Sequence, residues 1–510
     1  MAQTRRLMKR EITYSAAAKD PFDMLHALSY YPQTVRFFTH LRKNLALIQE
    51  ITAHHLGASP EACHVCPEVK DWRWGSFNVC IPITITTTQK RVLIRFPIPH
   101  CVGEAFWPGN ADEKLRCEAG TYAWLQENCP SVPIPKLFGF ALSTGQSLTA
   151  TENLPRMSRY LHYLRRLILK AFTRAVPSRY IPHKGPNASG LQTGYLLIEY
   201  VEEADGLMLS QTWDNGRSDV KLRANLFRGL SKILLAMAGV PVPRIGSYII
   251  NDSGLLTLTN RPLSIEIAEL EKGGIPVDIP RGVTYSSTDA YLAKTLALHD
   301  SRLYHQRNSV NNREDCIDQM SALTIMKTVA SHFFKRELGH APFVYMLSDL
   351  HRSNILVDND WNIKCIIDLE WACARPIGML HPPEWLTSQA VDEIDLNAYD
   401  PLRQEFMNIL ENEEQRLCHG IRLSKAMHQG WDMGTFWYSL ALQSPTGLFT
   451  IFYEHIQPKF NASHATDPSF YSIASSYFTM GAAAFIKKKL NEKAEYDERL
   501  REEFSIQEAR

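Results

Sequence analysis

The chain has 510 residues, of which 45 % are hydrophobic and 21 % are charged. A chain of this length and composition can bury a sizeable core in two or three packed units, which excludes a largely disordered protein. Its 55 lysines and arginines balance 54 aspartates and glutamates, so no overall charge favours nucleic acid, and attraction to a membrane would need a local patch.

Residues 1–65 are expected to form an N-terminal helical extension, because apolar residues recur there at helical spacing. The basic start of the chain lacks the apolar core of a secretory signal, and no apolar run reaches roughly 18 residues. Ten scattered cysteines favour reduced thiols over a disulfide framework. We therefore expect a cytoplasmic protein.

Residues 66–200 are predicted to form a β-rich unit. Isoleucines at 81, 83 and 85 alternate with polar residues, which predicts a strand that turns near residues 88–90 into a second strand. A helix of 3.6-residue period follows, and further strands are expected in VPIPKLFGFAL and YLLIEYVE.

Residues 143–192 interrupt this unit as a polar, basic insertion without a strand pattern. Within it, residues 153–174 predict a basic amphipathic helix, which can lie on an anionic membrane or bind an acidic partner. The favoured alternative is that the apolar stripe packs on the β-rich unit and the cations are solvated. The stripe comprises Met157, Tyr160, Leu161, Leu164, Leu167, Ile168, Ala171 and Phe172, and the cations are Arg159, Arg165, Arg166, Lys170 and Arg174.

Residues 201–510 are mostly helical in pattern, apart from one strand–turn–strand element at 343–372. Strands thus gather early and helices late. This order predicts an α+β protein with a small β-rich lobe and a larger, mostly helical lobe.

The strand–turn–strand element carries the most informative residues. Asp349 and Asn354 stand in a D-x-x-x-x-N pattern, and Asp368 follows the second apolar run, so a hairpin would bring Asp368 back towards Asn354. Phosphoryl transfer needs a carboxylate that accepts or orients the proton of the acceptor hydroxyl, and hard oxygen ligands for Mg²⁺. We predict Asp349 and Asn354 as catalytic residues, with Asn354 and Asp368 as the metal ligands.

The alternative is a hairpin whose polar residues only make turn hydrogen bonds. This suits the turn residues Asp358, Asn359 and Asp360. It suits Asp349 and Asp368 poorly, because both border apolar strands, where an unpaired carboxylate is costly.

DLHRSNILVD followed by IIDLEWA resembles the aminoglycoside phosphotransferase and choline-kinase-like family of the protein-kinase-like superfamily, and its divergent fungal members in particular. The resemblance extends from about Trp72 to Phe460. It implies a five-stranded N-lobe, a hinge, a helical C-lobe and ATP in the cleft between them. It also implies transfer of the γ-phosphate of ATP, with Mg²⁺, to a hydroxyl of a small-molecule or protein acceptor. His351 falls on the loop histidine of the family.

In such enzymes a strand lysine pairs with a helix glutamate. The corresponding residues here are Arg95 and Glu118, with Glu113 as a less favoured substitute for Glu118. An arginine can still meet phosphate oxygens bidentately, although a purely structural ion pair is the alternative.

Two backbone segments complete the predicted nucleotide site. Gly75 and Ser76 would form a sparse phosphate loop, because a glycine lets the backbone approach a phosphate. Backbone groups from Glu199 to Val201 would form the hinge that meets adenine.

Three departures from the family pattern motivate a second hypothesis. Arg95 replaces the lysine, the phosphate loop holds one glycine, and Leu347 stands where the family has a histidine before the catalytic aspartate. The alternative is therefore a weak or inactive pseudokinase that acts as a nucleotide-binding or protein-interaction scaffold. The acceptor is not identified by sequence, and no nucleic-acid partner is expected.

Overall fold

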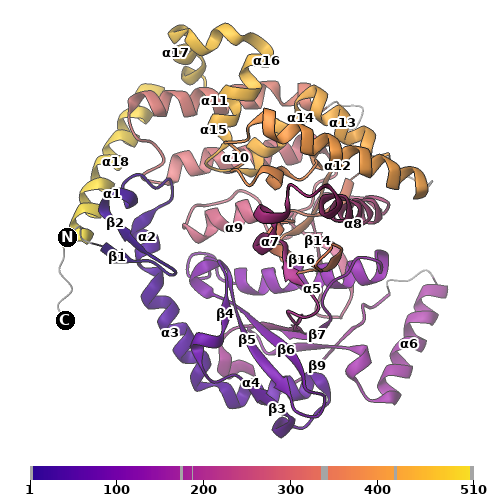
Figure 1. Cartoon of the computed structure of the whole chain (residues 1–510). Coiled ribbons are helices and arrows are strands. Elements are labelled where there is room, and N and C mark those ends of the chain that lie inside the picture. The colour runs from indigo at the N-terminus through magenta and orange to yellow at the C-terminus, as the bar shows by residue number, and fades with distance from the viewer. Residues whose placement is uncertain (1–3, 173–175, 186–187, 335–342, 418–421, 506–510) are drawn as a thin grey trace.

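The computed structural model describes residues 4–172, 176–185, 188–334, 343–417 and 422–505. A sheet-rich region, built mainly from the first 200 residues, lies against a helical region built mainly from the second half of the chain (Figure 1). This arrangement confirms a mixed architecture in which strands come early and helices late.

The sheet-rich region is one antiparallel sheet of eight strands, more than the five that the resemblance implies. Its strands run in the order β3-β5-β6-β10-β7-β8-β9, and β4 pairs with β5 off this path. The strands are β3 (Cys63–Val65), β4 (Arg73–Trp74), β5 (Asn78–Ile85), β6 (Lys90–Pro97), β7 (Leu137–Ala141), β8 (Gln146–Ala150), β9 (Tyr180–Lys184) and β10 (Tyr195–Glu199).

The β5–β6 hairpin follows the predicted pattern. Ile81, Ile83 and Ile85 are buried and alternate with less buried residues, as expected for a strand with one face on the core. Ile81 pairs with Ile94, and Cys80 pairs with Arg95. The predicted strand pair and its turn near residues 88–90 are therefore confirmed.

The expectation that residues 143–192 lack strands is wrong. β8 and β9 lie in this segment and pair with each other at one side of the sheet. Polar side chains in these strands are buried because they form hydrogen bonds with one another and with helix α4 (Leu45–Leu56). Thr149 Oγ1 lies 2.6 Å from His55 Nδ1 and 2.5 Å from His183 Nε2. A periodicity of apolar residues therefore could not reveal them.

The N-terminal helices α3 (Tyr30–Lys43) and α4 (Leu45–Leu56) pack beside the sheet. His55 on α4 is fully buried, and its Nε2 lies 2.9 Å from the Tyr195 hydroxyl of β10. Burial, together with the nearby His183 and His54, lowers the pKa of His55 to about 3. The imidazole is therefore held neutral where α4 joins the sheet.

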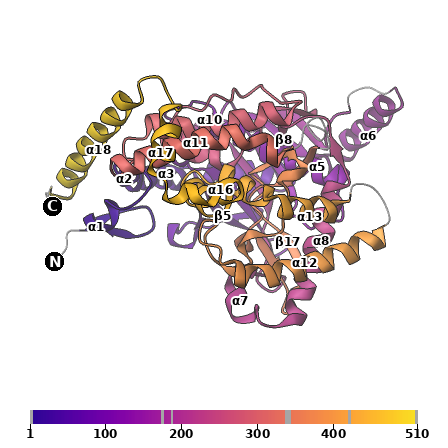
Figure 2. The same ribbon diagram turned by 90° about the horizontal axis from the view of Figure 1, so that it is seen from above.

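The first residues of the chain are not helical throughout. β1 (Thr4–Arg6) pairs with β2 (Glu11–Thr13), and the short helices α1 (Tyr14–Ala17) and α2 (Met24–Leu28) follow. With the last helix, α18 (Ala482–Ser505), they form a small core of Ile12, Ala17, Met24, Tyr496, Leu500 and Phe504. Helix α18 thus lies beside the first described elements of the chain (Figure 2). Strands of three residues are too short to give a periodic signal.

The helical region contains most of the remaining chain and three small sheets, ordered β11-β16-β17, β12-β15-β18 and β13-β14. Among the described residues, no helix is long and apolar enough to cross a membrane. The longer helices are α8 (Val220–Ala238), α10 (Thr288–His305), α11 (Arg313–Phe333), α12 (Leu396–Leu417), α13 (Leu423–Met433) and α14 (Thr435–Gln443), with α7 (Leu209–Gly216), α9 (Ile265–Lys272), α15 (Leu448–Ile451), α16 (Gln457–Asn461) and α17 (Pro468–Ser476) between or after them. The small strands are β11 (Leu207–Met208), β12 (Pro241–Val242), β13 (Ser247–Ile250), β14 (Leu256–Asn260), β15 (Phe343–Leu347), β16 (Ile355–Val357), β17 (Ile363–Ile366) and β18 (Ala372–Pro376).

Helix α5 (Asn110–Asn128) lies between the large sheet and the β13–β14 hairpin, and most of its first four turns are buried. At Gly120 the hairpin approaches so closely that a Cβ atom would lie 2.2 Å from the carbonyl oxygen of Tyr248. This contact fixes the depth of α5, and α5 in turn carries Glu118 to the junction of the two regions.

Candidate active site

The D-x-x-x-x-N loop joins β15 to β16. Asn354 Nδ2 donates hydrogen bonds to the backbone oxygen of Asp349 at 2.9 Å and to its carboxylate at 3.1 Å. The N–H of Ile367, one residue past β17, donates to the Asn354 carbonyl at 2.9 Å. The β16–β17 hairpin therefore brings Asp368 alongside Asn354, as the sequence predicts.

The turn of this hairpin has a structural role. The Asp358 carboxylate accepts hydrogen bonds from the N–H groups of Asp360 and Asn362. Trp361 stacks on Trp213 of α7, with ring centroids 5.3 Å apart. The turn-forming alternative thus describes Asp358, whereas Asp349 and Asp368 lie outside the turn.

Asp368 has a left-handed backbone conformation, with φ at 62°. Residues other than glycine adopt this conformation uncommonly, and such strain gathers at functional sites. Its side chain is 32 % exposed, and one carboxylate oxygen lies 2.5 Å from Arg95 Nη2. Asp368 is thus the partly exposed member of an otherwise buried ion cluster.

Arg95 of β6 is the centre of that cluster. Its side chain is 6 % exposed and contacts Glu118 of α5 at 2.9 Å and Glu370 at 2.6 Å, in addition to Asp368. The structure therefore brings Arg95 and Glu118 together, as predicted. Glu113 does not substitute for Glu118, because it pairs with Arg261 instead.

Three further members of the cluster were not predicted. Lys114 Nζ forms ion pairs with Glu370 and, at 3.8 Å, with Glu118, and it donates to Asn78 Oδ1 at 2.6 Å. Asn78 Nδ2 donates to Glu370 at 2.6 Å. Two signals were available in the sequence: Lys114 stands four residues before Glu118 on one helix face, and Glu370 stands two residues after Asp368.

The cluster has an excess of acidic groups. Three carboxylates (Glu118, Asp368 and Glu370) face two cations (Arg95 and Lys114), which leaves one negative charge when all are ionised. Burial raises the pKa of Glu118 to about 7. In Glu370, burial acts in the same direction, but the charges of Lys114 and Arg95 outweigh it and lower the pKa.

Asp349 adds a further carboxylate at the solvent-facing side. The pKa of Asp349 is raised to about 7, mainly by burial and also by the negative charges of Asp368 and Glu370, while the hydrogen bond from Asn354 acts in the opposite direction. Burial likewise raises the pKa of Asp368, although Arg95 opposes this effect. The acidic excess is therefore concentrated on Asp349 and Asp368, which are both partly exposed.

These residues fit a magnesium ion that arrives with phosphate groups. Mg²⁺ commonly binds through one or two protein oxygen ligands and completes its shell with phosphate oxygens and water. Asn354 and Asp368 supply such oxygens beside an uncompensated negative charge. Within the part of the chain that the structure describes, no group of three or more His, Cys, Asp or Glu residues could hold a metal by itself.

Gly75 and Ser76 form the turn between β4 and β5, closed by a 2.9 Å hydrogen bond from the Gly75 N–H to the Asn78 carbonyl. The turn adjoins the cluster through Asn78. It also lines a cavity of about 540 Å³ together with the N-terminal segment and α9. A Cβ atom at Gly75 would meet nothing within 4 Å, so packing alone does not require glycine there.

The predicted hinge lies apart from the ion cluster. Glu199 pairs with Val92, three residues before Arg95 on β6, which corresponds to a separation of about 10 Å. The N–H of Glu199 donates to the Lys136 carbonyl at 2.8 Å, so this amide is not available to a ligand. Val201 follows directly after β10 and is partly exposed.

The loop around Asp349 is supported by apolar and backbone contacts. Leu347 packs against the main core and gives the loop apolar support. Ser348 Oγ donates to the Trp371 carbonyl at 2.5 Å. His351 Nδ1 accepts a long hydrogen bond of 3.4 Å from the Ser353 N–H, so it braces its own loop only weakly.

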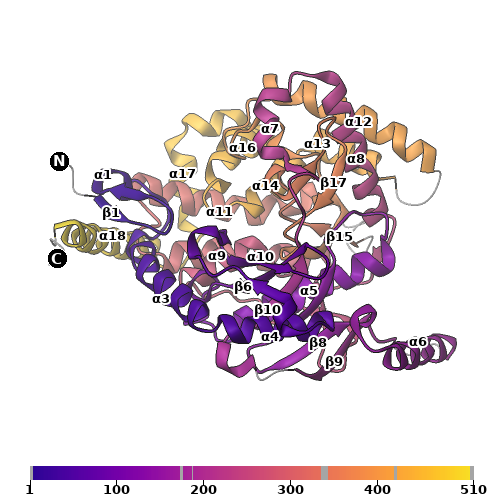
Figure 3. The ribbon, with the colours of Figure 1, turned by 60° about the horizontal axis from the view of Figure 1, so that its bottom comes forward.

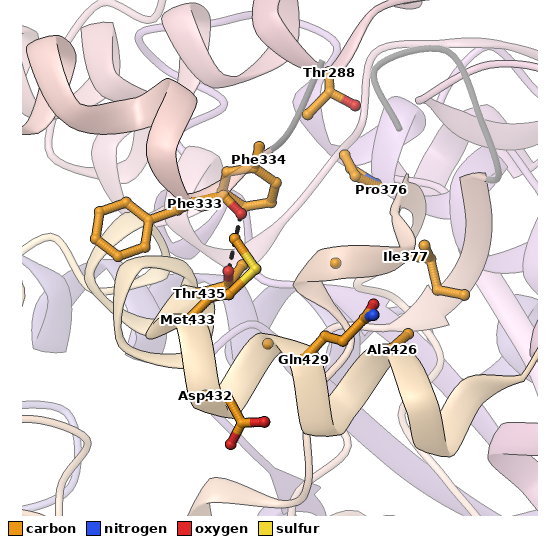
Figure 4. A pocket seen from close by; sticks show the side chains of 12 residues that line it. Thr288, Phe333, Phe334, Pro376, Ile377, Ala426, Gln429, Asp432, Met433 and Thr435 are labelled. Atoms are coloured by element: carbon orange, nitrogen blue, oxygen red, sulfur yellow. Dashed lines mark hydrogen bonds between the residues drawn. The ribbon is translucent and has the colours of Figure 1, made fainter. Parts of the chain in front are cut away.

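A cavity of about 190 Å³ lies beside this loop and is lined by Ser348 and Leu350, the neighbours of Asp349. Polar side chains in its wall include Glu266, His381 and Glu384. A cavity of about 550 Å³ lies elsewhere, between α11, α13 and the segment after β18 (Figure 4). Its lining includes Phe333, Phe334, Pro376, Ile377, Gln429, Asp432 and Met433, and it contains none of the predicted site residues.

No family model matches the chain. No curated protein matches it either. Among solved structures, the chain is similar to a macrolide 2'-phosphotransferase type I, with 12 % identity, a TM-score of 0.33, and coverage of 82 % of this chain and 91 % of that chain. It is also similar to an ethanolamine kinase from Plasmodium vivax, with 11 % identity, a TM-score of 0.32, and coverage of 81 % and 85 %. At these TM-scores the likeness does not decide the activity, which has to be inferred from the site itself.

Proposed function

We propose that the protein is an ATP- and Mg²⁺-dependent phosphotransferase of the two-lobed, protein-kinase-like type, related to the aminoglycoside phosphotransferase and choline-kinase-like group. The observation that supports this most strongly is the row formed by Asp349, Asn354 and Asp368. The row is partly exposed, a side-chain hydrogen bond joins Asp349 to Asn354, and the N–H of Ile367, next to Asp368, donates to the Asn354 carbonyl. Asp368 connects the row to the buried ion cluster, which has an excess of negative charge.

Each predicted residue has a distinct role in this proposal. Asp349 orients the acceptor hydroxyl and accepts its proton, for which a pKa of about 7 is well suited. Asn354 holds Asp349 in place and, with Asp368, would hold Mg²⁺. The bound ion would supply charge neutralisation between the β- and γ-phosphates.

The remaining residues hold the nucleotide. The turn at Gly75 and Ser76 would lie near phosphate, with the Gly75 N–H engaged by the Asn78 carbonyl, and Arg95, oriented by Glu118, would offer its guanidinium to phosphate oxygens on the side facing Asp368. The Glu199 carbonyl and Val201 are the hinge groups left for adenine.

The acceptor is proposed to be a small molecule that carries a hydroxyl group. The cavity beside Ser348 and Leu350 is about 190 Å³, below the roughly 300–1,000 Å³ of common small-molecule pockets, so it suits a compact acceptor better than a protein segment. Its wall combines apolar side chains with Glu266, His381 and Glu384.

A second candidate function, a pseudokinase scaffold, is favoured by one specific contact. Arg95 Nη2 lies 2.5 Å from Asp368 and 2.6 Å from Glu370, so the cation that should meet phosphate is engaged by the carboxylate that should meet metal. An active enzyme has to exchange this contact for metal and phosphate, whereas a scaffold can retain it.

Thermal unfolding with ATP and Mg²⁺ tests the nucleotide site. A ligand at 100 times its dissociation constant stabilises the folded state by about 2.7 kcal/mol, a shift of a few degrees. We expect Mg²⁺-dependent stabilisation of the wild type and of Asp360→Asn, a turn control, and its loss in Asp368→Asn. Absence of any Mg·ATP effect on the wild type would reject both candidates that bind nucleotide.

Turnover separates the two candidates. With a pool of small hydroxyl compounds as acceptors, the enzyme should release ADP, and Asp349→Asn should slow this at least roughly 100-fold while Mg·ATP still stabilises the variant. Binding without turnover in the wild type would instead support the scaffold.

A further inference from the structure

Helix α6 (Arg156–Ala171) stands at the margin of the molecule, away from the main body (Figures 1 and 3). Arg159, His162 and Arg166, which lie on one face of the helix, attach it to neighbouring described residues. His162 Nε2 lies 3.0 Å from the Ser178 carbonyl, Arg166 Nη1 donates to the Pro177 carbonyl at 2.7 Å, and Arg159 donates to the Glu152 carbonyl at 2.5 Å. Arg166 also pairs with Glu127 of α5 at 3.0 Å.

The apolar stripe therefore faces outward, and the favoured expectation that it packs on the sheet is wrong. The physical reason is that the body offers backbone carbonyls to this helix, and these bind the arginine and histidine donors. Arg174, predicted as part of the same helix, lies outside the described residues. The exposed fractions along the stripe are 69 % for Met157, 65 % for Tyr160, 57 % for Leu161, 42 % for Leu164, 67 % for Leu167 and 47 % for Ile168.

The charges around this stripe are all of one sign. Residues 156–171 include five cationic side chains and no acidic one, although the whole chain is balanced at 55 to 54. At 100° per residue, Arg165 falls on one margin of the stripe, and Arg156 and Lys170 fall on the other. All three are exposed, and no acidic side chain among the described residues pairs with them.

We propose that α6 is a membrane-surface helix, which binds an anionic lipid interface with its apolar stripe in the acyl region and its marginal cations at the headgroups. A helix in the interface plane needs an apolar face about as wide as this one, cationic flanks and aromatic residues near the boundary, such as Tyr160 and Tyr163. The proposal does not depend on the phosphotransferase activity.

Two other occupants fit the observations less well. In a symmetric pair of copies joined through this stripe, the cationic margins of one helix would meet those of the other, and like charges would oppose the contact. An acidic protein groove would match the charge, but α6 is a single convex helix on a projecting arm, and a planar surface can reach its whole length.

The test is co-sedimentation of the full chain with vesicles of phosphatidylcholine alone and of phosphatidylcholine with 30 % phosphatidylserine. We expect binding to the anionic vesicles only, weakening as salt rises. Leu164→Glu/Ile168→Glu should abolish it. Arg165→Gln/Lys170→Gln should weaken it about 30-fold, from the contribution of two cations near an anionic surface.

Matched controls lie on other helices. Val220→Glu changes an apolar residue that is 63 % exposed on α8, and Lys487→Gln/Lys488→Gln removes two exposed cations from α18. Both should bind like the wild type. Amide hydrogen exchange should slow in residues 156–171, and not in α18, when anionic vesicles are added.

Three results would overturn the proposal. The first is no binding of the wild type to anionic vesicles at low salt. The second is binding that the α6 variants do not change although their thermal unfolding matches the wild type. The third is a concentration-dependent dimer that Leu164→Glu/Ile168→Glu abolishes, which would assign the stripe to a second copy of this chain.

Discussion

Arg95 holds the two regions of the molecule together electrostatically, and its removal has a calculable consequence. It is 6 % exposed and contacts three carboxylates at 2.9, 2.5 and 2.6 Å. Each pair contributes an attraction of about 4 kcal/mol at an effective dielectric constant of 20 and a charge separation of about 4 Å. Against this stands a desolvation penalty of several kcal/mol for the guanidinium.

Arg95→Met removes the cation and keeps most of the side-chain volume. The acidic side chains of Glu118, Asp368 and Glu370 then face only Lys114, so we expect the free energy of unfolding to fall by about 3–5 kcal/mol at pH 8. The pH dependence has a definite sign. Without Arg95 the pKa values of these buried carboxyls rise above their values in the unfolded chain. The loss of unfolding free energy caused by Arg95→Met therefore grows as the pH rises above about 4.5, and it shrinks at lower pH, where the carboxyls are protonated.

Urea unfolding at pH 8.0 and pH 5.5, in buffer with a metal chelator, measures both effects. The control is Arg116→Met, whose partner Asp252 is 73 % exposed, and which should cost less than about 1 kcal/mol. A loss below about 1 kcal/mol for Arg95→Met at pH 8.0 would refute the account of the cluster. So would a loss that is equally large at both pH values.

Two further predictions concern the packing of α4 and α5. The folded pKa of His55 is about 3 and its ordinary value is 6.5, so its neutral form stabilises the fold fully above pH 6.5, and this contribution is lost as the pH falls from 6.5 towards 3. By linkage, the loss of stability is about 2 kcal/mol at pH 5. Thermal unfolding of His55→Gln should lack that part of the pH dependence. Gly120→Ala should destabilise the protein by about 1–3 kcal/mol although alanine favours helix, because its Cβ would lie 2.2 Å from the Tyr248 carbonyl oxygen. In the same thermal unfolding experiments, Gly430→Ala is the control: its Cβ would have its nearest neighbour 3.9 Å away, and it should stabilise the protein by up to about 1 kcal/mol. Stabilisation by Gly120→Ala, or an unchanged pH profile for His55→Gln, would contradict the respective interpretation.

Local sequence patterns predicted the parts of the fold that depend on periodicity. The alternation in β5 and the spacing of Asp349, Asn354 and Asp368 around a short hairpin both have a direct structural counterpart. The strands β8 and β9 were missed because hydrogen bonds to His55 and His183, not apolar alternation, bury their residues. These two bonds join residues 94 and 34 positions apart in the chain, which no local pattern contains.

The amphipathic helix shows a different limit. Its stripe was visible in the sequence, but the side on which it attaches depends on what the neighbouring chain offers. Carbonyl oxygens at Pro177 and Ser178 bind the polar face, and the apolar face is left outside. The hydrophobic pattern alone identifies a face and does not say whether that face is covered.

Although β6 carries an arginine, the ion cluster still contains a lysine, Lys114. Lys114 of α5 supplies an ammonium group to the same carboxylates and lies fully buried behind them, in contact with Glu370 and Asn78. Arg95 lies in front, with Nη2 on the partly exposed Asp368. An incoming phosphate would therefore meet the partly exposed Asp368 before the buried guanidinium, so Arg95 would have to leave Asp368 to reach it. Glu370 would remain neutralised by Lys114 when Arg95 moves. On the proposed function, Lys114 keeps that charge compensated, so Arg95 would exchange Asp368 for phosphate at a smaller electrostatic cost than a single shared cation would incur. Under that proposal the arginine is compatible with catalysis.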